Sequence, residues 1–267
     1  MRILLCCFAC SPNTGSEGGV GWRYATALCQ KHDVWVLTDI SRRDAIEQSA
    51  LSNHPRLHFI YYRPSWISGL SLNSKTAHVI YQLWLRSSLP VAEKLDKEVN
   101  FDICWHLTYG VFRQANPLWK LGKPFVFGPV GGGESAPIRL WRSLPFGEIV
   151  REISRDLINH LALCQPALRR MYAHAALVIA RTEETRDLLP SSMRNRVVIQ
   201  HEVGGYPGAK FVRQPRDTTK PVRLLFAGRL LGWKGVHLAI RAVHDYILRC
   251  HACVFSIAGS GPMYDVL

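Results

Sequence analysis

The residues best suited to hold a phosphate group lie near the carboxyl end of the chain, in Gly228-Arg229-Leu230-Leu231-Gly232-Trp233-Lys234-Gly235. Arg229 offers a planar fork of hydrogen-bond donors, and Lys234 offers a point charge. A helix is expected to begin at about Gly235, and its positive end would add to the attraction. The loop is not a Walker loop, because the Gly-Lys-Ser/Thr spacing is absent. We therefore expect Arg229 and Lys234 to bind a diphosphate.

A second glycine-rich stretch, Gly15-Ser16-Glu17-Gly18-Gly19-Val20-Gly21, follows the first strand-like run. Its glycines would let the backbone approach a ligand, and amides at a helix amino end favour a phosphate or a sugar hydroxyl. The nearest alternative is a nicotinamide dinucleotide site, since Gly19 and Gly21 form a GxG pair and Asp39 ends the second strand. That fingerprint fails at its third glycine, where Tyr24 would obstruct the packing of helix on strand.

Two further loops with polar residues follow strand-like runs. His106 comes directly after the run 101–105, where it would point into the ligand crevice and could donate to a sugar hydroxyl or share a proton with a leaving phosphate. A histidine alone in such a place is more often structural. In Gly128-Pro129-Val130-Gly131-Gly132-Gly133-Glu134, the glycines give room for a polyhydroxyl ligand and Glu134 gives a hydrogen-bond acceptor. A mobile surface loop is the alternative for that stretch.

Short apolar runs alternate with longer helical patterns along the whole chain. Nine runs are typical of strands: 2–9, 33–38, 56–62, 101–105, 124–128, 176–180, 196–200, 222–227 and 253–258. Six ranges are typical of helices: 19–31, 41–51, 76–99 with a break at Pro90, 147–174, 182–189 and 235–249. Ser41 and Thr182 stand where helix caps belong. Several strands are apolar on both faces, as in a parallel sheet covered by helices, so the expected fold class is α/β and doubly wound.

The alternating pattern lapses between 201 and 221, where Gly, Pro, Thr and charged residues gather. We place a first domain over 1–205, a linker over 206–221 and a second domain over 222–267. The second domain holds one strand, one helix, a second strand and a glycine-rich turn, which is too little to bury a core by itself. We therefore expect a second domain that is incomplete.

The chain carries 33 Lys and Arg against 20 Asp and Glu, a net charge of +13 that attracts phosphate-bearing partners. Many of the basic residues between Arg139 and Arg196 are spread among apolar ones, as on a solvated basic face or a surface that contacts a membrane. They form no recognisable RNA or DNA motif with exposed aromatic residues, so we do not expect nucleic-acid binding.

The amino terminus, MRILLCCFAC, is predicted to be a buried strand rather than a secretion signal, because its apolar run is short. No stretch has the length of apolar residues that a transmembrane helix needs. We expect a cytoplasmic protein, with peripheral contact at the inner face of the cell membrane as an open alternative.

Eight cysteines include two CxxC pairs, Cys7 with Cys10 and Cys250 with Cys253, a spacing found in zinc and redox sites. Cys6 and Cys7 lie in a predicted strand, where neighbouring side chains point to opposite faces. We therefore expect small apolar cysteines in a reducing compartment, and no metal.

Together these loops resemble glycosyltransferase family 4, whose members have the GT-B fold of two Rossmann-like domains facing each other across a cleft. The resemblance covers essentially the whole chain, and the order and spacing of its segments are specific. Those segments are Ala9-Cys10-Ser11-Pro12, Gly15 to Trp22, His106, Gly128 to Glu134, Arg181-Thr182-Glu183-Glu184-Thr185, Gly228-Arg229 with Lys234-Gly235, and Gly259-Ser260-Gly261-Pro262.

The resemblance implies transfer of a sugar from a nucleoside-diphosphate donor to a sugar or lipid-linked acceptor, with retention of anomeric configuration, in polysaccharide or glycolipid synthesis. The donor would be held by Arg229, Lys234, Gly18 and Gly19. The acceptor or sugar would be bound by Glu17, Gly131, Gly132 and Glu134, with His106 as the catalytic group near the reacting sugar. Neither glutamate is assigned as a nucleophile. No metal or cofactor is implied, since the nucleotide sugar is a co-substrate.

One departure from the family concerns the carboxyl end. Family members continue past the Gly-x-Gly-Pro turn into strands that carry two glutamates for the donor ribose and sugar, and then into a helix that crosses back to the first domain. Residues of that kind are not in this sequence, which ends at Leu267. The alternative expectation is therefore a truncated, catalytically inactive remnant that acts at most as a binding module.

Overall fold

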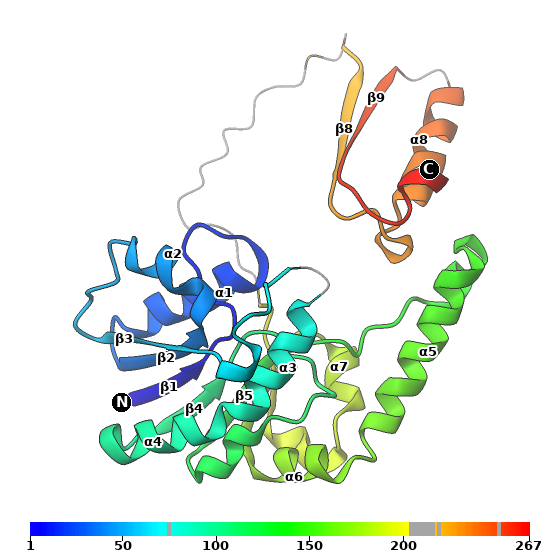
Figure 1. Ribbon diagram of the computed structural model, residues 1–267. Helices are drawn as coiled ribbons and strands as arrows, with labels where there is room; N and C mark the ends of the chain where they lie inside the picture. The colour runs from blue at the N-terminus through cyan, green and yellow to red at the C-terminus, as the bar shows by residue number, and fades with distance from the viewer. Residues whose placement is uncertain (74–75, 203–216, 218–219, 250–251) are drawn as a thin grey trace. The chain divides into compact units, whose positions relative to one another are not determined.

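The computed structural model describes residues 1–73, 76–202, 217, 220–249 and 252–267 (Figure 1). The chain forms two compact units. The first unit comprises Met1–Glu134 and Ile158–Gly204, and the second comprises Ser135–Leu157 and Gly205–Leu267. The segment Ser135–Leu157, which the sequence places in the first domain, thus groups with the second unit. Most of the predicted linker, 206–221, lies outside the described residues.

The first unit is built on a seven-stranded parallel sheet in the order β3-β2-β1-β4-β5-β6-β7. Its strands are β1 (Arg2–Cys6), β2 (Asp33–Asp39), β3 (Leu57–Tyr62), β4 (Ile103–His106), β5 (Phe125–Val130), β6 (Ala175–Ala180) and β7 (Val197–Ile199). All seven strand predictions for this unit are confirmed. The strand order reverses between β1 and β4, which makes the carboxyl ends of these two strands the expected place for a ligand.

Helices connect the strands. They are α1 (Ser16–Leu28), α2 (Arg43–Glu47), α3 (Ala77–Ser87), α4 (Leu89–Val99), α5 (Phe146–Ala162), α6 (Pro166–His174) and α7 (Glu183–Leu188). Short 3₁₀ turns cover Ile40–Arg42, Ser65–Ile67, Pro117–Leu121, Ile138–Ser143, Ser191–Arg196, Gly232–Lys234 and Tyr264–Val266. The break in the range 76–99 is confirmed: α3 ends before Ser88, and Pro90 lies in the first turn of α4. The range 147–174 is two helices, because Pro166 begins α6.

One of the two predicted helix caps is confirmed. The side chain of Thr182 accepts a hydrogen bond from the backbone N–H of Thr185 at 3.2 Å and caps α7. The prediction for Ser41 is wrong. Asp39 is the capping residue there, since its carboxylate accepts the backbone N–H of Ser41 at 3.0 Å, and Ser41 lies inside the 3₁₀ turn.

Two apolar clusters lie on opposite faces of this sheet. β1 and the residue after it contribute to both: Leu4 and Cys6 pack in one cluster, and Leu5 and the adjoining Cys7 pack in the other. The first cluster also holds Tyr81, Trp84 and Leu85 of α3, Ala92 of α4, and Leu168, Met171 and Tyr172 of α6. The second also holds Ala25 of α1 and the adjoining Cys29. Helices therefore cover both faces, and the predicted doubly wound α/β class is confirmed (Figure 1).

Five cysteines of this unit are buried thiols, Cys6, Cys7, Cys10, Cys29 and Cys104, whereas Cys164 is exposed. Cys7 and Cys10 are free, and burial raises the pKa of Cys10 to about 12. Cys250 lies outside the described residues. Across the described part of the chain, no three His, Cys, Asp or Glu side chains gather as metal ligands.

Within the residues that the structure describes, none of the helices combines the length and apolar character needed to cross a bilayer.

The second unit contains one βαβ element of β8 (Val222–Ala227), α8 (Val236–Leu248) and β9 (Cys253–Ala258), as predicted. The two strands are parallel. Leu230, Val236 and Met263 form a small core in this unit, and Phe226 and Ile240 pack against it.

Candidate functional site

Polar residues from distant parts of the chain meet at the carboxyl edge of the seven-stranded sheet. Glu17 accepts the backbone N–H of Tyr109 through Oε2 at 2.8 Å. Its Oε1 lies 3.5 Å from Nη2 of Arg181, which also donates to Oε1 of Glu202 at 2.9 Å. We call Glu17, Arg181 and Glu202 the edge network. One guanidinium thus holds two carboxylates at the edge where parallel sheets bind ligands.

The backbone places Arg181 in this network. Arg181 is the first residue after β6, and its N–H donates to the carbonyl of Val130 at 2.9 Å. Its side chain passes over Gly131, where an added Cβ would lie 3.1 Å from Cδ of Arg181. Gly131 therefore leaves room for the guanidinium to reach the edge.

The edge network contains one carboxyl group that titrates near neutral pH. Burial and the neighbouring Glu17 raise the pKa of Glu202 to about 7, although Arg181 and Arg23 oppose that rise. A carboxyl group with a pKa close to the working pH can both accept and donate a proton. The network can therefore bind a polar ligand and exchange a proton with it.

The pKa of Glu202 predicts a pH effect on stability. Between pH 4.5 and 7 the unfolded state loses the Glu202 proton while the folded state keeps it, so the free energy of unfolding falls as pH rises. Glu202→Gln should lack this fall. Each pKa unit is worth about 1.4 kcal/mol, and solvent screening lowers the sum, so we expect a difference of about 1–2 kcal/mol. Urea unfolding of both proteins across this range measures it, and parallel pH profiles would contradict it.

The loop Gly131 to Glu134 is held by its own carboxylate. Oε1 of Glu134 accepts the hydroxyls of Thr182 and Thr185 at 3.1 Å each, and Oε2 accepts the N–H of Gly132 at 2.8 Å. Burial raises the pKa of Glu134, but these hydrogen bonds and one from its own backbone outweigh burial, so the pKa lies below its ordinary value. Glu134 thus fixes the loop as an ionised carboxylate. Its predicted role toward a ligand, and those of Gly131 and Gly132, stay predictions.

The first glycine-rich stretch has a packing role that the sequence does not reveal. α1 begins at Ser16, three residues before the predicted start, so Gly18 and Gly19 lie in its first turn. An added Cβ at Gly19 would lie 2.1 Å from the carbonyl oxygen of Thr14, and one at Gly21 would lie 2.3 Å from that of Ala9. These glycines let α1 pack directly on the preceding loop. The donor-binding role of Gly18 and Gly19 stays a prediction.

His106 ends β4 as expected, but the prediction that its side chain points into an open crevice is wrong. The residue has no exposed surface, because α3 and the following loop cover it. Nε2 of His106 lies 3.0 Å from the hydroxyl of Tyr81, and that hydroxyl is 3.2 Å from the carbonyl oxygen of Tyr109. Burial lowers the pKa of His106 to about 3, so the imidazole is neutral at physiological pH. Its catalytic role stays a prediction.

The nicotinamide alternative does not fit the structure. Asp39, the residue that would bind a ribose, has no exposed surface and is held by Arg63 through both oxygens, with Nε to Oδ2 at 2.9 Å. Ser41 also donates to Oδ1 at 2.6 Å. Tyr24 occupies the third glycine position and contacts Trp105 edge-on, with ring centres 5.6 Å apart. Because Asp39 is fully buried and ion-paired with Arg63, its carboxylate cannot reach a ribose hydroxyl.

Arg229 and Lys234 of the second unit are both exposed, on the loop between β8 and α8. That loop bonds to the turn after β9: the N–H of Leu230 donates to the carbonyl of Ser260 at 2.9 Å. An added Cβ at Gly259 would lie 1.9 Å from the carbonyl oxygen of Gly228, so this glycine permits the contact. Nζ of Lys234 lies 4.4 Å from the ring centre of Trp233. The structure thus joins the two glycine-bearing loops, and diphosphate binding by Arg229 and Lys234 stays a prediction.

Sequence reasoning did not name Arg181 or Glu202 as site residues. Both follow strand ends, Arg181 directly after β6 and Glu202 three residues after β7. The rule that led to His106, which looks for polar residues after strands, would have found them if it had been applied to these two strands. The ion pair between Arg181 and Glu17 could not be foreseen from the sequence, because it depends on the order of the strands in the sheet.

Comparisons with known proteins give structural matches only. The chain matches no family model, and no curated protein matches it in sequence. For the glycotransferase of kitacinnamycin, the match covers 97% of this chain and 65% of that protein, with 12% identity and a TM-score of 0.42. For the glycosyltransferase SnogD from Streptomyces nogalater, the match covers 87% of this chain and 58% of SnogD, with 16% identity and a TM-score of 0.40. For Streptomyces sp. SF2575 glycosyltransferase SsfS6, complexed with thymidine diphosphate, the match covers 98% of this chain and 72% of SsfS6, with 15% identity and a TM-score of 0.35.

The chain spans less than two thirds of the length of the first two of these proteins. The fold class rests on the parallel sheet and its two covered faces, not on these matches.

Proposed function

We propose that the chain is a glycosyltransferase of the GT-B type that moves a sugar from a nucleoside-diphosphate donor to an acceptor, with retention of anomeric configuration. The observation that carries the proposal is the edge network. Arg181 and its two carboxylates lie beside two glycine-bearing loops at the carboxyl edge of a parallel sheet, where α/β folds bind polar ligands. The resemblance of the same loops to glycosyltransferase family 4 supplies the reaction.

On the donor side, Arg229 and Lys234 would bind the diphosphate and stabilise the negative charge that develops as it leaves. Their exposure and the absence of any carboxylate bonded to them, among the residues that the structure describes, support this role. In the first unit, Gly18 and Gly19 would offer the amide end of α1 to a donor group.

On the acceptor side, Glu17 would accept a hydrogen bond from a sugar hydroxyl, beside Gly131 and Gly132. Glu134 would shape that loop, since three hydrogen bonds already occupy its oxygens. His106 would position Glu17 through a chain of contacts, because it bonds Tyr81, Tyr81 bonds the Tyr109 carbonyl, and the Tyr109 N–H bonds Glu17. The product would be a polysaccharide or glycolipid.

Titration calorimetry with uridine, guanosine and thymidine diphosphates and their sugars tests the donor site. We expect saturable binding that Arg229→Ala weakens about tenfold or more, since a charge-assisted hydrogen bond is worth at least about 1.4 kcal/mol. Arg223→Ala, an exposed arginine on β8 of the same unit, is the matched control and should bind like the wild type. Equal binding by the Arg229→Ala variant, or no binding by the wild type, would refute the donor site.

Turnover separates an enzyme from a module that only binds. Incubation with a donor that binds, followed by NMR of the sugar product, should show a linkage with the anomeric configuration of the donor. Inversion would contradict the retaining mechanism. Donor binding without transfer to any acceptor would favour the binding module.

A further inference from the structure

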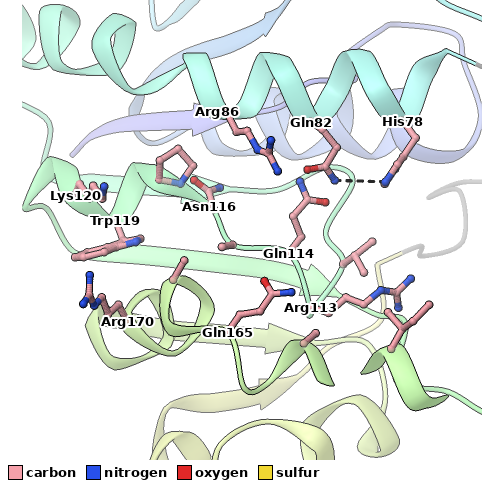
Figure 2. Close-up of a pocket in the computed structure, with 16 residues that line it drawn as sticks. His78, Gln82, Arg86, Arg113, Gln114, Asn116, Trp119, Lys120, Gln165 and Arg170 are labelled. Carbon is pink, nitrogen blue, oxygen red and sulfur yellow. Dashed lines mark hydrogen bonds between the residues drawn. The ribbon is translucent and has the colours of Figure 1, made fainter. Parts of the chain in front are cut away.

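The first unit contains an open cavity of about 610 Å³ that no sequence motif indicates (Figure 2). It lies between α3, the connection from β4 to β5, and the α5–α6 segment. Its walls hold His78, Gln82, Arg86, Val111, Arg113, Gln114, Ala115, Asn116, Pro117, Trp119, Lys120, Ile158, Ala162, Gln165, Ala167 and Arg170. The absence of Asp and Glu from this set of described residues gives the cavity a positive potential.

Two side-chain amides in the wall have unused donors. Nε2 of Gln114 and Nδ2 of Asn116 are buried and have no hydrogen-bond partner among the described residues. Asn116 is 1% exposed, and its Oδ1 accepts the N–H of Leu118 at 2.8 Å, which fixes the amide. A buried donor without a partner costs about 1–3 kcal/mol. A ligand with acceptor oxygens would remove that cost.

Three cations of the cavity wall have no carboxylate partner in the described part of the chain: Arg86, Lys120 and Arg170. Figure 2 shows Arg86 beside Gln114 and Asn116 on the α3 side, and Arg170 on the opposite wall near Trp119 and Lys120. Cations and amide donors without competing acids are the chemistry that recognises a phosphate.

The rest of the wall is apolar. Val111, Ala115, Pro117, Ile158, Ala162 and Ala167 line it together with the ring of Trp119. That ring is stacked on His174, with ring centres 4.4 Å apart, and is held in place. A ligand that fills the cavity therefore needs an apolar part as well as an anionic one.

The cavity is connected to the edge of the sheet by direct contacts. Nη1 of Arg113 donates to Oδ1 of Asn159 at 2.7 Å, and Nδ2 of Asn159 donates to the carbonyl of Gly132 at 2.9 Å. Val111 pairs with Gly131 through a β-bridge. A molecule bound in the cavity would thus lie next to the glycine loop proposed for the acceptor.

We propose that this cavity binds a phosphate-bearing amphiphile. Arg86, Arg170 and Lys120 supply the positive charge that attracts the phosphate, the two unused amides donate to its oxygens, and the apolar wall contacts the apolar chain. The proposal that the cavity binds such an amphiphile rests only on the residues of the cavity. The role of the amphiphile as the sugar acceptor rests on the proposed function.

Octyl phosphate is a soluble probe for the cavity, and calorimetry measures its binding. We expect saturable binding that Arg86→Gln and Arg170→Gln each weaken about tenfold and together weaken about a hundredfold. Arg169→Gln changes the neighbouring exposed arginine of α6, which does not line the cavity, and should bind like the wild type. Thermal unfolding of each variant checks that it is folded. Equal affinity of the double variant, or equally tight binding of octanol, would overturn the proposal.

Two competitors identify the source of the phosphate. Displacement of octyl phosphate by vesicles that contain phosphatidic acid, and not by phosphatidylcholine vesicles, would support a lipid headgroup. Displacement by inorganic phosphate would support a free phosphate group. Nucleoside-diphosphate binding is measured separately and depends on Arg229, so loss of one site leaves the test of the other intact.

Discussion

Arg63→Ala is expected to lower the free energy of unfolding by about 3–5 kcal/mol, because it leaves the buried carboxylate of Asp39 without its cation. The Asp39 side chain has no exposed surface and that of Arg63 is 6% exposed. Arg63 binds both oxygens of Asp39 and also donates to the carbonyl of Leu70 at 2.9 Å. Urea unfolding measures the loss.

An exposed ion pair in the same region provides the matched control. Arg43 and Glu47 are bonded at 2.9 Å, but each side chain is 53% exposed, so Arg43→Ala should change stability by less than about 1 kcal/mol. Adding Asp39→Asn to Arg63→Ala should recover part of the stability, since the buried charge is then gone. A loss below about 1 kcal/mol for Arg63→Ala alone would show that the pair contributes little.

The second large effect is the dependence of stability on pH through His106. Its folded pKa is about 3, against an ordinary value of 6.5, because burial disfavours the charged imidazole. As pH falls below 6.5 the unfolded state gains a proton that the folded state does not, so stability decreases until about pH 3. At about 1.4 kcal/mol for each pKa unit, the decrease reaches about 5 kcal/mol.

His106→Gln removes the titrating group and should flatten this part of the profile. Urea unfolding at several pH values between 3 and 7 compares the two proteins. The Glu202 effect has the opposite sign, a fall in stability as pH rises from 4.5 to 7, so the two single variants separate the groups. If the wild type and His106→Gln lose stability in parallel on acidification, His106 is not the responsible group.

Periodicity predicts the strands and helices of this chain well because the signal is local. All nine strand-like runs are strands, and Thr182 caps its helix as its position indicates. A run such as β5 is buried along its whole length, so a parallel sheet with two covered faces follows directly from its composition.

Side-chain surroundings were predicted less well because they depend on which elements become neighbours. His106 is at the predicted strand end, yet Tyr81 of α3 covers it, and no local pattern places that tyrosine there. Ser41 is not the capping residue that its position suggested, because the side chain of Asp39, which Arg63 holds in place, caps the 3₁₀ turn instead. The cavity is assembled from three separate segments, so its chemistry emerges only from the packed fold.

The edge network also has a consequence for the order of folding. Glu17 and Arg181 are 164 positions apart in the chain, and Glu202 lies still further on. Contacts between such distant residues form late, since the chain between them must first be closed into a large loop. During synthesis, domains fold from the amino end as the chain emerges. A ligand that requires all three residues would therefore bind only after the whole parallel sheet has been made, and its binding would report completion of the first unit.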